Sequence, residues 1–253
     1  MEILFRDETV LAVLKPPGLS VHEAPGPGRS LLRALREENG LDGWTPVHRL
    51  DKDVSGVLLL ARDRAAARAL ERRWGEVGKT YLALCEGVPS PETGVIDAPI
   101  LEHQTGKPHR LETALRKFRE AHPGVALPPL PAPKTSAVHP AGRPSRTHYR
   151  VVETFGEAWS LLEVQPEQGR MHQLRVHLKH LGTPLAVDPL YGRRRQRPSG
   201  TEGGIGLARV SLHAARLTFP HPCEPGRSVT VEAPLPADLR QAIAHFRSLR
   251  KAN

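Results

Sequence analysis

One short segment concentrates side chains that could do chemistry. The stretch before the apolar run 56–61 holds, within eight positions, His48, Arg49, Asp51, Lys52, Asp53 and Ser55. A polar loop that enters a buried strand is a rigid mount for reactive side chains. A carboxylate is ionised at neutral pH, so it could act as a nucleophile or stabilise a developing cation. The bland alternative is a turn in which Asp51 or Asp53 accepts hydrogen bonds from backbone amides.

A second segment combines an apolar stripe with cations. Residues 170–181 place Met171, Leu174, Leu178 and Leu181 at helical spacing, and Gly182 and Pro184 follow as a stop signal. His172, Arg175 and Lys179, at i, i+3 and i+7, share a different face of such a helix. The spacing predicts a helix that packs with one face and presents cations on the other. A solvated basic face that binds nothing is the alternative.

The segment 193–206 is basic and rich in glycine. Its cations could close on phosphate groups, or they could form a solvated loop; they are Arg193, Arg194, Arg195 and Arg197.

Other chemistries find little support in the sequence. His172, His177 and His180 are spaced i, i+5 and i+8, which does not bring all three to one helix face, and there is no HExxH or paired CxxC motif. We therefore expect no metal site. Cys85 stands in an apolar stretch and Cys223 follows a proline, so neither is a good nucleophile. No GxxxxGK[ST] segment indicates nucleotide hydrolysis.

The charge balance narrows the partners. The chain has 253 residues, with 36 Lys and Arg against 27 Asp and Glu, which gives a net charge of +9. Nucleic acid, an anionic membrane surface and an acidic small substrate are all compatible with this excess. Arginine makes up most of it, which favours nucleic acid, although codon bias would give the same skew. No run of about 18 apolar residues or signal peptide is present, so we expect a cytoplasmic protein.

These segments must be positioned by a framework of strands and helices. The sequence predicts helices at 30–39, 63–74, 170–181 and 237–249, and strands at 2–7, 10–15, 56–61, 80–85, 148–154, 159–165, 214–219 and 228–232. Because strands outnumber helices and often neighbour each other, we expect a mainly antiparallel α+β fold flanked by helices. Residues 121–146 contain seven prolines and no clear period. They predict a surface excursion from a single domain, 1–253.

Five segments together resemble the RluA-type family of RNA pseudouridine synthases. HRLDKDVSG at 48–56 is similar to the family signature HRLDxxTSG, with Val54 in place of the usual threonine. The other similar segments are KPPGLSVHE at 15–23, KTYLALCEG at 79–87, GRMHQLRVHLKHLGTPLAVDPLYG at 169–192 and LHAARLTFPHP at 212–222. They occur in family order and cover almost the whole chain. Ala186 and Val187 depart from the residue-Gly pair usual before Asp188.

The resemblance implies a fold and an activity. The fold would be the pseudouridine synthase catalytic domain with a central RNA-binding cleft, without a separate RNA-binding domain before residue 1. The activity would be isomerisation of specific uridines to pseudouridine in structured ribosomal or transfer RNA, after the base leaves its stack. An isomerisation needs no redox, metal or nucleotide cofactor. We expect RNA as the partner, no membrane association and a monomer.

The resemblance also implies roles for individual residues. Asp51 matches the catalytic aspartate, which could attack C1′ of the ribose, attack C6 of the base or abstract the C2′ proton. Tyr81 matches a tyrosine that stacks on the flipped uracil, with its hydroxyl near the proton on C5. Arg49 would take the place left by the flipped base. Arg175 would hold Asp51 ionised and oriented, with Arg170 as the alternative.

The remaining assignments are binding residues. His48, Arg170 and His172 would contact the substrate, and Lys15 and Lys179 would join the arginines of 193–197 in binding phosphate. Two other functions stay open. The chain could be a non-catalytic RNA-binding or folding factor on the same scaffold, or an RNA hydrolase that uses His48 and Asp51.

Overall fold

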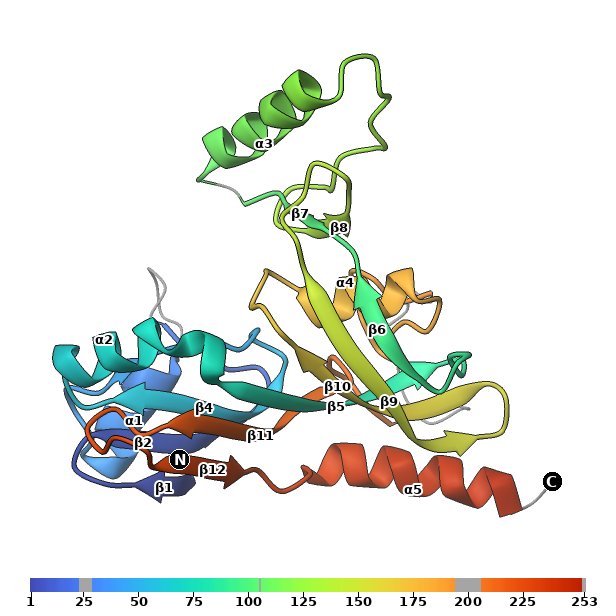
Figure 1. Cartoon of the computed structure of the whole chain (residues 1–253). Coiled ribbons are helices and arrows are strands. Elements are labelled where there is room, and N and C mark those ends of the chain that lie inside the picture. The colour runs from blue at the N-terminus through green and yellow to red at the C-terminus, as the bar shows by residue number, and fades with distance from the viewer. Residues whose placement is uncertain (23–28, 105, 194–205, 252–253) are drawn as a thin grey trace. The chain divides into compact units, whose positions relative to one another are not determined.

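The chain divides into two compact units in the computed structural model, which describes residues 1–22, 29–104, 106–193 and 206–251 (Figure 1). Unit 1 comprises Met1–Ala83 and Pro198–Asn253, and unit 2 comprises Leu84–Arg197. Strand pairing is mostly antiparallel and five α-helices accompany the strands in the described residues, so the predicted α+β class is confirmed. None of the described helices is long and apolar enough to cross a membrane.

Unit 1 is built on a sheet whose strands come from both ends of the chain. The strand order is β1 (Ile3–Arg6), β2 (Val10–Lys15), β4 (Ser55–Ala61), β11 (Leu212–Pro220) and β5 (Gly78–Glu86, of which residues up to Ala83 belong to this unit). β3 (Thr45–Pro46) pairs with β4, and β12 (Ser228–Glu232) pairs with β11. The pair β4–β11 is parallel, whereas β1–β2, β2–β4 and β11–β5 are antiparallel. The helices of this unit are α1 (Leu31–Asn39), α2 (Arg64–Arg72), the 3-10 turn η1 (Trp74–Glu76) and α5 (Ala237–Lys251).

The sequence explains the central elements of unit 1. Every residue of β4 is buried, as its continuous apolar run predicts, and the core packs Leu59 of β4 with Leu70 of α2 and Phe219 of β11. The hydroxyl of Ser30 accepts a hydrogen bond from the Arg33 amide and caps α1. Asp63 caps α2 in the same way.

Unit 2 contains a second group of strands. β10 (Trp159–Pro166), β9 (Arg146–Phe155) and β6 (Thr93–Asp97) lie side by side in that order, all antiparallel. The predicted hairpin between β9 and β10 turns at Gly156, whose φ of 63° suits glycine. A small two-stranded sheet joins β7 (Ile100–Glu102) to β8 (Ser136–Val138), and the helices are α3 (Pro108–Ala121) and α4 (Gln173–His180).

Two predicted segments of unit 2 differ from the structure. The proline-rich excursion predicted at 121–146 contains β8, and the stretches without helix or strand are 122–135 and 139–145. The helix predicted at 170–181 begins only at Gln173, because His172 has a left-handed φ of 58°. The expected cationic face is also wrong in part, because Arg175 is buried, whereas Lys179 and His180 are exposed.

Candidate active site

Four neighbouring strands of unit 1 align one residue each at the candidate site. Lys15 of β2 is opposite Gly56 of β4, Gly56 is opposite Ala214 of β11, and Ala214 is opposite Tyr81 of β5. Residues directly opposite each other across a sheet point to the same face. The two central members of this row carry at most a methyl group. The side chains are therefore small between Lys15 and Tyr81, and Lys15 contacts the loop that carries Asp51.

Asp51 stands on a tight turn that leads into β4. The Val54 amide donates to the Asp51 carbonyl at 3.1 Å. The Lys15 ammonium donates to the Lys52 carbonyl at 2.8 Å, and also to the carbonyls of Pro16 at 2.9 Å and Leu19 at 2.8 Å. Lys15 is completely buried, and these three bonds use all three protons of an ammonium group. Lys15 therefore has no proton left for the expected phosphate contact, and its side chain instead fixes the turn that carries Asp51.

The Asp51 carboxylate acts electrostatically on both ends of the row, Lys15 and Tyr81. Burial lowers the pKa of Lys15 to about 8, while the carboxylates of Asp53 and Asp51 act in the opposite direction. Burial also raises the pKa of Tyr81, and the Asp51 carboxylate raises it further. The Tyr81 hydroxyl therefore keeps its proton at neutral pH, under the electrostatic influence of the Asp51 carboxylate.

His48 anchors the loop that carries Asp51 to β4. Its Nε2 accepts a hydrogen bond from the Leu59 amide at 3.0 Å, and its ring centroid lies 5.2 Å from that of Trp74. Burial and the positive charge of Lys79 lower the pKa of His48 to about 4, although a hydrogen bond with the Arg49 backbone acts in the opposite direction. The imidazole is thus neutral at pH 7 and bonded to backbone at both nitrogens. These contacts favour a positioning role for His48 over the expected substrate contact, which stays a prediction. Arg49 beside it is exposed.

A buried serine–histidine pair lies at the start of β4, directly after the turn, and was not predicted from the sequence. Ser55 Oγ is 2.9 Å from His213 Nδ1, and His213 Nε2 is 3.3 Å from the Ala233 carbonyl. At the next position, a Cβ on Gly56 would stand 2.2 Å from the Ala214 carbonyl oxygen. Only glycine permits β4 and β11 to approach this closely. Both residues lie in segments that match the family, Ser55 in 48–56 and His213 in 212–222. The first segment was interpreted only for its aspartate and the second only as a strand.

Unit 2 contains a buried arginine–aspartate pair. Arg175 Nε donates to Asp188 Oδ2 at 2.7 Å and Arg175 Nη2 donates to Oδ1 at 2.8 Å. Asp188 Oδ1 also accepts from the amides of Leu190 at 2.9 Å and Tyr191 at 3.1 Å. No role was predicted for Asp188 from the sequence. The arginine predicted to hold Asp51 is oriented by this second carboxylate, and the Arg175–Asp51 pairing stays a prediction.

The other predicted residues of 170–181 lie near Tyr191. His172 Nδ1 is 2.8 Å from the Tyr191 hydroxyl, which accepts a bond from the Ser136 amide at 2.9 Å. Lys179 is exposed, and its ammonium lies 6.0 Å from the centroid of the Tyr191 ring. Within the described part of the chain, Nε of Arg170 is buried and makes no hydrogen bond, although Nη2 reaches the Pro144 carbonyl at 3.3 Å. Arg170 thus keeps a donor available.

The predicted phosphate-binding run is described only at its start. Arg193 is exposed, donates to the Gly182 carbonyl and lies 3.9 Å from a Glu86 carboxylate oxygen. Arg194, Arg195 and Arg197 lie outside the described residues.

A cavity of about 780 Å³ adjoins the Lys52 side of the turn. Its lining includes Pro16, Pro17, Ser20, His22 and Lys52. Across the described ranges, no three His, Cys, Asp or Glu side chains are grouped so that they could hold a metal ion. Burial raises the pKa of the Cys85 thiol, which disfavours the thiolate needed of a nucleophile.

Comparison with known proteins gives this α+β fold and site a family. The family model described as RNA pseudouridylate synthase matches residues 9–180, so the chain belongs to that family. An uncharacterised RNA pseudouridine synthase of Chloroflexus aurantiacus is 43% identical over 89% of this chain and 63% of its own length. Ribosomal large subunit pseudouridine synthase D of Nitrosomonas europaea is 38% identical over 98% and 66%. Ribosomal large subunit pseudouridine synthase C of Escherichia coli is 36% identical over 98% and 70%.

Solved structures agree with the family. Human RNA pseudouridylate synthase domain containing 4 superposes with a TM-score of 0.71 at 25% identity, over 97% of this chain and 93% of that one. Human RNA pseudouridylate synthase domain containing 1 gives 0.68 at 26% identity, over 100% and 95%. The chain spans about two thirds of the length of the curated relatives.

Proposed function

We propose that this protein isomerises uridine to pseudouridine within RNA. The observation that carries the proposal is the placement of Asp51. The aspartate of the matched HRLD segment stands on a turn anchored by the buried Lys15 ammonium, and its charge acts on the Tyr81 hydroxyl. Because the chain belongs to the RNA pseudouridylate synthase family, the reaction we assign to this carboxylate is the isomerisation of uridine.

The chemistry needs a carboxylate and a place for one proton. The N1–C1′ bond breaks, the uracil turns, and C5 forms a bond with C1′. The proton that leaves C5 is balanced by one gained at N1, so the atoms are conserved. Asp51 would begin this exchange at C1′, at C6 or at the C2′ proton. The Tyr81 ring would stack on the base, and its hydroxyl would take part in moving the C5 proton.

Other residues would bind and orient the nucleotide. Arg49 is exposed next to the turn, which suits a cation that fills the space left by a flipped base. Arg175 would orient Asp51, while its pairing with Asp188 fixes its own guanidinium. Arg170, which has a buried Nε without a hydrogen bond in the described chain, is the alternative. Contact of His172 and Lys179 with RNA belongs to the same proposal.

We propose large-subunit ribosomal RNA as the substrate. Two relatives, 38% and 36% identical to this chain, are named ribosomal large subunit pseudouridine synthases. Transfer RNA, also expected from the sequence, is the second substrate to test. A monomer in the cytoplasm stays a prediction.

The decisive experiment replaces Asp51. The purified chain, Asp51→Asn and Asp53→Asn are incubated with unmodified large-subunit ribosomal RNA transcript, and pseudouridine is quantified by nucleoside chromatography. We expect product with the unaltered chain, none with Asp51→Asn, and retained product with Asp53→Asn, which alters a carboxyl on the same turn. RNA binding should survive in both variants.

Three outcomes would overturn the proposal. Product with Asp51→Asn refutes the role of the carboxylate. RNA binding without product by the unaltered chain, on both ribosomal and transfer RNA, favours the non-catalytic binder. Strand breaks would indicate the RNA hydrolase, which the neutral, fully hydrogen-bonded His48 disfavours.

A further inference from the structure

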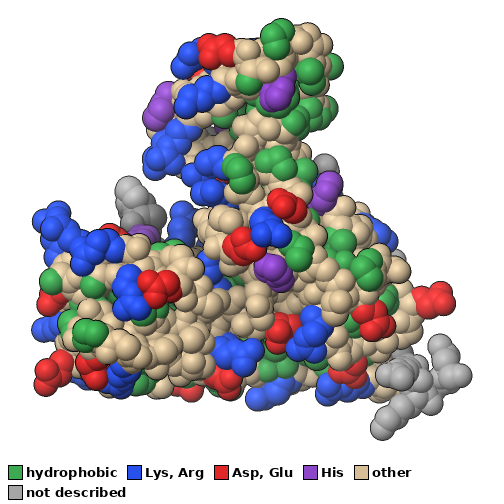
Figure 2. All heavy atoms as spheres, in the orientation of Figure 1, with side chains coloured by type: hydrophobic (Ala, Val, Ile, Leu, Met, Phe, Trp, Pro, Cys, Tyr) green, Lys and Arg blue, Asp and Glu red, His purple; other side chains and the backbone are tan. Residues whose placement is uncertain are grey.

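The net charge of the chain is concentrated in one excursion of unit 2. Residues 103–143 contain seven Lys and Arg and two Glu, an excess of five cations out of the +9 of all 253 residues. This stretch includes α3 and β8, and Figure 1 shows α3 beyond β7 and β8, away from β6, β9 and β10. In Figure 2, Lys and Arg side chains gather on one side of this region.

α3 is held in a fixed orientation by its apolar face. Leu115 is buried in a cluster with Leu101 and Ala141, and Leu111 and Phe118 pack against it. These helical residues recur at three- and four-residue spacing, so they define one side of α3. The side chains on its other sides therefore have fixed directions.

The charges of α3 are segregated by side. Arg110 and Lys117 are seven residues apart, almost two turns, so they lie on the same flank of the helix. Both are exposed, and no ion pair joins either to a carboxylate within the described residues. The opposite flank carries Arg116 and Arg119 with Glu112. Glu120 lies between the two flanks, three residues from Lys117, and pairs with Arg116 at 3.0 Å.

We propose that the flank of α3 that carries Arg110 and Lys117 binds the phosphodiester backbone of the RNA substrate, outside the nucleotide that reacts. The exposed Lys107, at the start of the helix, adds a third cation. The nearest acid, Glu120, is paired with Arg116. A cationic surface of this kind, without aromatic side chains, fits phosphate better than bases, so it adds affinity with little sequence preference. The inference rests on the proposed function for its ligand class.

The test compares two double variants with equal changes in net charge. Arg110→Gln with Lys117→Gln removes the proposed contacts, and Arg116→Gln with Arg119→Gln removes two cations from the opposite flank of the same helix. Affinity of the full chain for large-subunit ribosomal RNA transcript is measured between 50 and 200 mM salt. Each lost phosphate contact reduces the slope of log affinity against log salt by about one. Between 50 and 200 mM salt, the RNA affinity of the first variant should therefore fall about tenfold less than that of the unaltered chain. The affinity of the second variant should fall as much as that of the unaltered chain.

Equal slopes for the two variants would overturn the inference. An unchanged RNA affinity in the first variant would do the same, and would favour an acidic protein surface as the partner of this flank. Circular dichroism of both variants checks that α3 remains folded. Pseudouridine formation by the unaltered chain is measured in parallel, so that failure of the proposed activity is recognised separately from failure of this contact.

Discussion

Lys15 shows how one buried charge can support a reactive one. An ammonium group taken out of water is tolerated when all its protons meet acceptors. Here three carbonyls supply them, and the one from Lys52 belongs to the turn that presents Asp51. The position of the carboxylate thus depends on a side chain that no solvent or substrate reaches.

Replacement of Lys15 by methionine should destabilise the protein and slow the reaction. Lys15→Met keeps the shape of the stem but leaves three carbonyls without their donor, which costs about 3 kcal/mol. Urea unfolding measures the loss, and initial rates of pseudouridine formation measure the effect on the turn. Lys52→Ala is the control, because its exposed side chain can be removed while its carbonyl still accepts from Lys15; its stability should change by less than about 0.5 kcal/mol. Equal stability of Lys15→Met and the unaltered chain would contradict this role.

Removal of the Asp188 carboxylate should be among the most damaging single changes in unit 2. Asp188→Asn leaves the buried Arg175 guanidinium without its bidentate partner, and breaking such a pair costs about 3–5 kcal/mol. The control is Glu86→Gln, which lies 3.9 Å from the exposed Arg193 and should change stability little. Urea unfolding of the two variants decides the matter, and similar losses in both would count against a structural role for the pair.

At the residue scale, the sequence indicated which residues belong to the site better than it indicated whether their side chains are buried or exposed. Asp51 and Tyr81 were selected because their neighbours matched known segments, and that match also included Lys15, Ser55 and Asp188. The sequence could not show that Lys15 points inward, since burial of a lysine depends on carbonyls brought together by the fold. Arg175 was expected on an exposed face for the same reason: its partner Asp188 is thirteen residues away.

Elements with local signals were predicted closely. α1 begins after Ser30 and ends before Gly40, because both caps are written in the sequence. α4 begins later than its apolar spacing suggests, since the left-handed backbone of His172 is not visible in that spacing. α3 was missed, although its apolar residues repeat at helical spacing, because the prolines that follow it dominated the interpretation of that stretch.

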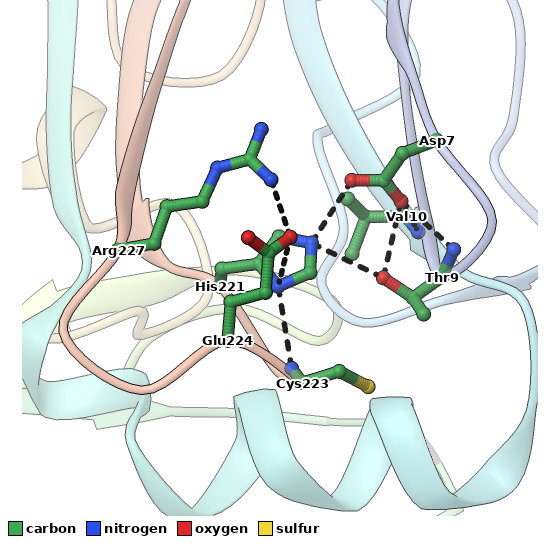
Figure 3. Close-up of polar contacts among 7 residues, drawn as sticks. All are labelled: Asp7, Thr9, Val10, His221, Cys223, Glu224 and Arg227. Atoms are coloured by element: carbon green, nitrogen blue, oxygen red, sulfur yellow. Dashed lines mark hydrogen bonds and ion pairs between the residues drawn. The ribbon is translucent and has the colours of Figure 1, made fainter.

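Two turns of unit 1, distant in sequence, are joined by one histidine (Figure 3). His221, after β11, has its Nε2 2.9 Å from Asp7 Oδ2 and 3.3 Å from Thr9 Oγ1 in the turn between β1 and β2. Its Nδ1 accepts from the Cys223 amide at 3.3 Å, so in the neutral ring the Nε2 proton is donated to Asp7. Asp7 also accepts from the amides of Thr9 and Val10, each at 2.8 Å.

This junction should lose strength in acid. Burial raises the pKa of Asp7, but the hydrogen bonds from Val10, Thr9 and His221 outweigh it and hold the pKa below the usual 3.8. A depressed folded pKa means that the stabilisation is present above the ordinary carboxyl pKa and is lost as pH falls through the folded value. Asp7→Asn should therefore lower the free energy of unfolding by about 1 kcal/mol at pH 6 and by less at pH 3. Urea unfolding at both pH values tests this, with the exposed Glu8→Gln as control; a deficit that grows in acid would refute it.

At the scale of the whole molecule, unit 1 is discontinuous in sequence. Its strands β2 and β4 come from the first part of the chain, whereas β11, which lies between β4 and β5, comes from the last. Local patterns predicted each strand, but they contain no information on which strands become neighbours. The parallel pairing of β4 with β11 depends instead on the close approach at Gly56, a contact between residues 158 positions apart.

Unit 1 should accordingly depend on the end of the chain, whereas unit 2 should not. A chain that stops at Gly206 lacks β11, β12 and α5, so β4 would lose a paired neighbour and the core would lose Phe219. Exposure of that core removes the main stabilisation of a small unit. Hydrogen–deuterium exchange should show protection lost at the amides of β2 and β4 in the truncated chain. The amides of β9 and β10, which pair with each other inside the contiguous unit 2, serve as the internal control and should stay protected. Protection retained at β4 would mean that the first 83 residues form a stable sheet alone, and the dependence of β4 on β11 would then be refuted.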